Sequence, residues 1–245
     1  MPASRPPRLV GALAGVALVL LLSACHVKVQ VDVSVQRDGS GAVTVAVGLD
    51  REALARVGDL RGQLHVDDLE SAGWTVTGPT ATSDGYTWVR ASKPFATPSQ
   101  LGEVMAEVNG PKGMFRDWKV SKSSSPWSTS WTATGTVDLS KGVEALSDPQ
   151  LDRALGSTGY RGVIDAIEKR EGKPIDQMVD VSVSVSVPGA SKVYTPSLGA
   201  AHPVPVRVTS TKVNALAGIT LIAVAVSILA VVLLLLRTRF THHRH

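Results

Sequence analysis

The sequence predicts an α+β domain built on a mostly antiparallel sheet of about seven strands with two to four packed helices, followed by one C-terminal transmembrane helix. Valines occupy alternate positions of Val27–Val35 and of Val179–Val187, which is the pattern of strands with one buried and one solvated face. Helix signals lie between these segments without the regular strand–helix alternation of a doubly wound fold. The third observation is the run Ala215–Leu236, which carries no charge.

Residues 1–24 predict a lipoprotein signal peptide. Arg5 and Arg8 precede the apolar stretch Leu9–Leu22, which has the length of a signal-peptide core and is short for a membrane span. Two small residues then precede Cys25, the only cysteine of the chain, in the order of a bacterial lipobox. We therefore expect a diacylglyceryl group on Cys25 and no intramolecular disulfide. The alternative is an ordinary secretory signal followed by an incidental cysteine.

Residues 214–236 predict a single transmembrane helix. The 22 uncharged residues Ala215–Leu236 reach about 33 Å, enough to cross a hydrocarbon core of roughly 30 Å. Arg237 and Arg239 follow as topology anchors, because positive charge of this kind stays on the cytoplasmic side. The tail 237–245 is therefore predicted to be cytoplasmic, and the body of the chain extracytoplasmic at the cell membrane.

The basic character of the chain belongs to its ends. Of 25 lysines and arginines, two lie in the leader and three in the tail, which leaves 20 against all 21 aspartates and glutamates in the extracytoplasmic part. That part is close to neutral, and it contains no Lys/Arg run interleaved with aromatic residues. We expect no nucleic-acid partner.

Turn and capping signals divide residues 25–189 into the elements of one extracytoplasmic domain. The predicted hairpins join Val27–Val35 to 43–47, 74–77 to 86–89, and 115–120 to 126–137. The predicted helices are a short one capped by Asp50, a stretch near 64–72, one that begins at Thr97, and a region from Asp148 to Gly172 that breaks at 156–159.

The clearest helix start is at Thr97. Thr97 is the N-cap, Pro98 occupies the first helical position, and Gln100 completes a capping box. The stripe that follows consists of Leu101, Val104, Met105 and Val108. Residues 190–213, rich in Pro, Ser and Ala, are predicted to be a stalk with an edge strand at Val204–Val208.

This organisation resembles the LppM-type envelope lipoproteins of actinobacteria. The resemblance rests on the segments His26–Val29, Arg37–Gly41, Gly73-Trp74, Gly85–Val89, Lys93–Thr97 and Val185–Gly189. It covers roughly Cys25 to Gly189 and the predicted span. It implies a sheet curved about a hydrophobic cavity and an association with phosphatidylinositol-type glycolipids of the envelope. The chain departs from the family pattern after Gly189.

No arrangement of residues in the sequence predicts catalysis. A nucleophile elbow and a Gly-rich phosphate loop are absent, and His26, His65 and His202 lie far apart along the chain. We interpret Asp67-Asp68 with Glu70 as a solvated helix face, and the histidines of the tail as part of a polar juxtamembrane segment. We therefore expect no enzyme activity, no cofactor and no metal.

The candidate binding residues are the aromatic side chains Tyr86, Trp88, Trp118, Trp127 and Trp131. The chain has five tryptophans against three tyrosines and three phenylalanines, so tryptophan is prominent among few aromatics. Core packing is the plain interpretation. The alternative is that some of these rings line an acyl-chain pocket or lie at the membrane interface, where amphipathic rings are favoured.

Together these features favour an envelope protein whose domain binds or handles membrane lipids and glycolipids without catalysis. Because the first strand starts directly after Cys25, we expect the N-terminal edge of the domain to lie against the bilayer. The alternative function is a non-catalytic scaffold that docks envelope proteins through exposed strands 27–35 or 179–187. A hydrolase is the third hypothesis, and it requires His65 to meet a serine and an acid in space.

Overall fold

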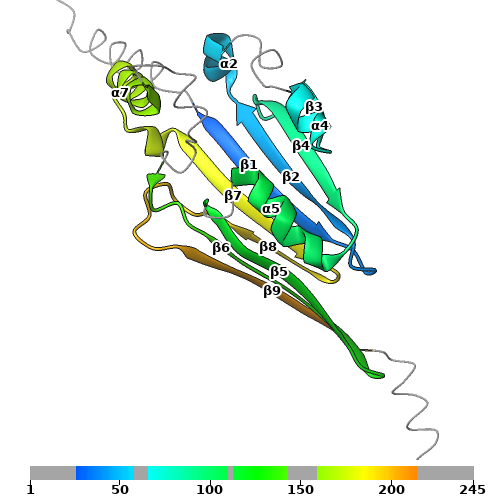
Figure 1. Ribbon diagram of the computed structural model, residues 1–245. Helices are drawn as coiled ribbons and strands as arrows, with labels where there is room; N and C mark the ends of the chain where they lie inside the picture. Colours follow the sequence, from blue (N-terminus) through cyan, green and yellow to red (C-terminus); the bar gives the residue numbers. More distant parts are fainter. Residues whose placement is uncertain (1–25, 58–65, 110–112, 143–158, 214–245) are drawn as a thin grey trace, which may run out of the picture.

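The computed structural model describes residues 26–57, 66–109, 113–142 and 159–213, and its α+β class confirms the prediction (Figure 1). The strands are β1 (Val27–Val35), β2 (Gly41–Leu49), β3 (Thr75–Ala81), β4 (Thr87–Phe95), β5 (Phe115–Ser124), β6 (Ser128–Val137), β7 (Val179–Val187), β8 (Ala190–Tyr194) and β9 (Val204–Val213). The helices are α2 (Arg51–Val57), α4 (Val66–Ser71), α5 (Leu101–Asn109) and α7 (Gly159–Glu171), with short 3₁₀ turns η1 (Pro98–Gln100) and η4 (Ile175–Gln177).

The strands form two sheets, where the sequence predicted one sheet of about seven strands. The larger sheet has the order β3-β4-β2-β1-β7-β8, and the smaller has the order β5-β6-β9. All neighbours are antiparallel except β1 and β7, which confirms the mostly antiparallel prediction. The single sheet and its strand count are corrected, because alternation along a strand does not specify which strand lies beside it.

The two valine-alternating strands lie in the interior of the larger sheet. β1 pairs with β2 on one side and with β7 on the other, and β7 pairs with β8 from Val183 onward. Neighbouring strands therefore occupy most of their backbone groups, and the expectation that these strands dock partner proteins loses its basis. Residues 179–182 are the exception, since the pairing with β8 does not reach them.

The core lies between the inner faces of the two sheets, with α5 packed against them (Figure 1). Most odd-numbered valines of β1, β2 and β7 pack into it, and Val33, Val43 and Val183 are almost fully buried. From α5, Leu101 and Met105 enter the same core, as the predicted stripe requires. Most of the space between the sheets is therefore filled with side chains.

Two of the helix caps predicted from the sequence, at Thr97 and Asp50, are present, and the one predicted at Asp148 lies outside the described residues. The side-chain oxygen of Gln100 accepts a hydrogen bond of 3.1 Å from the backbone N–H of Thr97, in the capping box before α5. Asp50 accepts a hydrogen bond of 2.7 Å from the backbone N–H of Ala53 at the start of α2. The second oxygen of Asp50 accepts a hydrogen bond of 2.6 Å from the backbone N–H of His26, so this side chain also fixes the start of β1.

The predicted stalk at residues 190–213 is instead part of the folded domain. β8 pairs with β7, and β9 pairs with β6 along its whole length. The Tyr194 hydroxyl donates a 2.7 Å hydrogen bond to the Arg207 carbonyl and accepts one of 2.8 Å from the Arg207 N–H. Pro205 shares the orientation of Arg207, so its missing N–H falls on the side away from β6 and the strand tolerates it.

Several predictions fall outside the described residues. They are the signal peptide 1–24, lipidation at Cys25, the span 214–236, the anchors Arg237 and Arg239, and the proximity of His65 to a serine. Within the described ranges, no helix is long and apolar enough to cross a membrane.

We expect Asp138→Asn to lower the acid sensitivity of the fold. The hydroxyl and N–H of Ser140, together with the Arg116 guanidinium, hold the pKa of the Asp138 carboxyl below its ordinary value. The stability that this carboxylate contributes is therefore present above the unfolded-state pKa of about 3.9 and is lost as the pH falls through the lower folded-state pKa. Urea unfolding at pH 6 and pH 3 should show a gap between wild type and variant that shrinks at pH 3; an unchanged gap would contradict the assignment.

Candidate functional site

An apolar groove opens on the core-facing side of the larger sheet, beside the filled core. Val43 is 0% exposed, but Val45 and Val47, the next inward residues of β2, are only half-buried. The groove has a volume of about 250 Å³. It is lined by Val45, Val47, Leu69, Trp74, Val76, Val89, Ala91, Glu107 and Val108.

The helices that the structure describes cover only part of this face, and the groove lies on the part that they leave open. α5 is nine residues long, and it contacts β5 of the smaller sheet much more than β2 or β4 of the larger sheet. Its last turn, with Glu107 and Val108, forms one wall of the groove, while Leu69 of α4 and Trp74 form another. The floor consists of β2, β4 and β3, which at about 4.8 Å between neighbours gives a width of roughly 10 Å.

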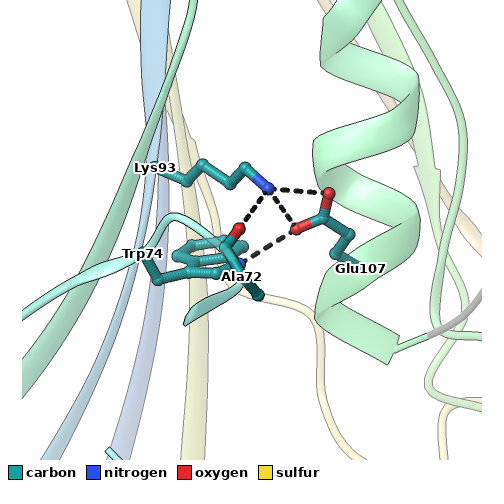
Figure 2. Close-up of polar contacts among 4 residues, drawn as sticks. All are labelled: Ala72, Trp74, Lys93 and Glu107. Atoms are coloured by element: carbon teal, nitrogen blue, oxygen red, sulfur yellow. Dashed lines mark hydrogen bonds and ion pairs between the residues drawn. The ribbon is translucent and has the colours of Figure 1, made fainter. Parts of the chain in front are cut away.

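Polar contacts close one part of the groove wall (Figure 2). The Glu107 carboxylate accepts a hydrogen bond of 3.0 Å from the indole N–H of Trp74 and bonds of 2.8 and 2.7 Å from the Lys93 ammonium. Lys93 also donates to the Ala72 carbonyl at 2.7 Å. These contacts join the segment after α4 to β3, β4 and α5, so they hold the helices over the sheet.

The chemistry of the groove is that of a binding site for an apolar chain. Glu107 is the only charged lining residue; its side chain is 40% exposed and its charge is matched by Lys93. Such a surface offers dispersion contacts and removal of apolar area from water. In the part of the chain that the structure describes, no three His, Cys, Asp or Glu side chains gather to hold a metal ion.

Two of the predicted binding residues, Trp88 and Trp118, pack on glycines instead. Trp88 is paired with Gly48 across β4 and β2, and a Cβ atom built on Gly48 would lie 2.8 Å from the indole. Trp118 lies in the same way over Gly135, where a Cβ atom would approach to 2.5 Å. Both indoles are buried, and each fills the space of a missing strand side chain.

The other three predicted residues are dispersed. Trp131 is buried, with the Lys122 ammonium 4.8 Å from its ring centre. Tyr86 lies 6.2 Å from Trp88 and carries the Lys28 ammonium 3.9 Å above its ring. Trp127 is half-exposed in the turn between β5 and β6. The structure therefore does not bring the five aromatic residues together, and none of them lines the groove.

Sequence reasoning missed Trp74, Lys93 and Glu107 as site residues. Val108, a member of the predicted helical stripe, lines the groove, but the stripe did not predict which residues lie around it. Glu107 is 14 residues from Lys93 and 33 from Trp74 in the chain, so no local pattern joins them. The only indication of this site in the sequence was Glu107, a glutamate next to the apolar stripe with no oppositely charged residue at helical spacing.

A second, more polar concavity of about 450 Å³ lies where β8 diverges from β7. Lys28, Asp176 and Asp180 contribute its charged groups, and residues 195–198 form its outer wall. It adjoins the stretch 179–182 of β7, which the pairing with β8 does not reach.

The chain matches no protein-family model and no curated protein. Among solved structures it is similar to the NMR structure of the folded domain of LppM from Mycobacterium tuberculosis, with 14% sequence identity and a TM-score of 0.37. That match covers 78% of this chain and 93% of the LppM domain. A similarity this distant assigns neither family nor activity, so the function must be argued from the groove.

Proposed function

We propose that this protein is a membrane-attached, non-catalytic binding protein that takes part of one acyl chain of an envelope lipid into the groove between β2, β3, β4 and α5. The observation that carries the proposal is the groove itself, in which valines of interior strands stay half-buried beside a filled core. Membrane attachment rests on the sequence, through the lipobox at Cys25 and the span 214–236.

The size of the groove limits what it holds. A methylene group occupies about as much room as a water molecule, ~30 Å³, so 250 Å³ accommodates roughly eight of them. At about 0.8 kcal/mol per buried methylene, the gross gain is on the order of 6 kcal/mol before the losses of association. This volume and this free energy suit reversible binding of one end of an acyl chain. They are too small for a whole diacyl lipid to be enclosed.

Among the described residues, Glu107 is the charged member of the groove lining, and Lys93 is its ion-pair partner. Lys93 and Glu107 together are neutral, but Lys93 has a side chain long enough to turn toward an anionic headgroup. A phosphatidylinositol-type headgroup is the ligand that the family resemblance of the sequence implies, and the lysine is compatible with its phosphate.

Native mass spectrometry of the full-length chain released from detergent tests this proposal. We expect a stoichiometric adduct with the mass of a lipid, which exchanges when phosphatidylinositol is added in excess. The control replaces phosphatidylinositol by a short-chain alcohol, which has no long acyl chain and should give no exchange. A clean apo mass that does not shift on lipid addition would reject lipid binding and favour the scaffold function, with 179–182 as the first stretch to crosslink.

A further inference from the structure

The smaller sheet leads directly to the predicted membrane span. β9 continues to Val213, and the apolar run begins at Ala215, so a single residue separates strand from span. Because Val213 pairs with Ser128, the turn between β5 and β6 lies level with the exit of the chain. Figure 1 shows this end of β5, β6 and β9 projecting beyond the larger sheet. We call residues 121–131 and 209–213 the tip.

The tip carries exposed apolar side chains of a kind that is rare elsewhere on the described surface. Among the described residues, three large apolar side chains are exposed: Trp127 at 48%, Val193 at 60% and Val213 at 71%. Two of the three belong to the tip. The turn that presents Trp127 is ordered by a 2.8 Å hydrogen bond from the Ser125 N–H to the Ser128 carbonyl, and a 3.0 Å bond from the Ser128 N–H to the Ser125 hydroxyl.

The charges of the tip suit the headgroup layer of a membrane. Lys122 and Lys212 lie in it, and its sequence contains no aspartate or glutamate. Most of the remaining side chains are serine or threonine hydroxyls, which hydrogen-bond equally well to water, phosphate and sugar. Amphipathic indoles concentrate at this depth of a bilayer, and basic residues are attracted to anionic lipid surfaces.

From these observations we propose that the tip lies in the headgroup layer of the outer leaflet, with the Trp127 indole as its interfacial anchor. The predicted span 214–236 ties the end of β9 to the bilayer surface, and the pairing of Val213 with Ser128 brings the Trp127 turn to the same depth. The inference rests on the predicted span and on the geometry of the smaller sheet. It is independent of lipid binding in the groove, so either proposal can fail alone.

Fluorescence quenching by brominated lipids tests the position of Trp127. The full-length chain is reconstituted into vesicles of phosphatidylcholine and phosphatidylglycerol whose acyl chains are brominated close to the headgroup. Trp88, Trp118 and Trp131 are buried and do not line the groove, and Trp74, which lines it, is replaced by phenylalanine in every sample, so the intensity lost to bromolipid should come mainly from Trp127. We expect Trp127→Phe to reduce the quenched intensity at least twofold, and Trp88→Phe, which removes a buried indole, to leave it unchanged.

A second pattern of quenching would contradict the inference. If Trp127→Phe leaves bromolipid quenching unchanged, while the emission that it removes is quenched by aqueous iodide, the tip stands away from the bilayer and the inference is overturned. Thermal unfolding of both variants shows whether each is folded. Trp127→Tyr, which keeps an amphipathic ring, provides a second substitution at the same position should the phenylalanine variant not fold.

Discussion

Val47→Phe will lower the affinity of the protein for a fluorescent fatty-acid probe at least tenfold. Val47 lies on the floor of the groove, half-buried on an interior strand, and its side chain borders the free volume of about 250 Å³. A phenyl ring added there occupies the space that we assign to the acyl chain. Losing about two of roughly eight buried methylenes already costs a factor of ten, at ~0.8 kcal/mol for each. The measurement is a titration of the probe against the full-length chain in detergent.

Val193→Phe is the matched control for this prediction. It makes the same change of side chain on a strand, but Val193 is exposed on β8 and does not line the groove. Wild-type affinity is expected for this variant. Both proteins should keep the wild-type circular dichroism spectrum, because the added ring at position 47 enters an open space and not a filled core. Tight probe binding by a folded Val47→Phe protein would mean that the acyl chain binds elsewhere.

The sequence predicted local structure well, because local structure is decided by near neighbours. The valine alternation of β1 and β7, the three hairpins and the capping box at Thr97 all depend on residues a few positions apart. Each of these signals has a direct physical cause in the two-residue period of a strand or in the unpaired N–H groups of a helix start.

Partners and packing were not predictable in the same way. The valine pattern of β1 does not predict that its parallel neighbour is a strand about 150 residues later in the chain. The groove depends on which part of the larger sheet α5 leaves uncovered, and that is decided by the tertiary packing of both sheets. The sequence could not distinguish the packing of Trp88 and Trp118 over glycines from a place in a pocket, because a buried tryptophan above a glycine and a pocket tryptophan have the same sequence signature.

The corrected stalk changes how the predicted membrane attachments constrain the domain. With a free stalk, only the acylated Cys25 would fix the domain at the bilayer. With β9 paired up to Val213, the predicted span would fix it as well. The contact of the Lys122 ammonium with the Arg37 carbonyl places the Val35 end of β1 near the tip, so Val27 at the other end of this strand lies about 26 Å away, at ~3.3 Å per residue. If both predicted attachments enter one leaflet, the domain lies along the membrane.

Gly135→Val will destabilise the domain by about 3 kcal/mol. A Cβ atom at position 135 would lie 2.5 Å from the Trp118 indole, which is buried on the core side of the smaller sheet. The indole has little room to withdraw, since Trp118 is only 3% exposed and lies within the main core cluster. Overpacking of this kind forces side chains from their rotamers or shifts the strand. Urea unfolding followed by tryptophan fluorescence measures the loss.

The double variant Gly135→Val with Trp118→Leu tests the cause of that loss. If the clash with the indole is responsible, the smaller leucine relieves it, and the double variant is more stable than the sum of the two single effects predicts. If the two losses of unfolding free energy simply add, the loss in Gly135→Val comes from the backbone of β6 and not from the contact with Trp118. Residues in contact typically show a coupling of about 1 kcal/mol or more. A coupling of that size would mean that Trp118 packs specifically on Gly135, and its role would then be structural and not lipid binding.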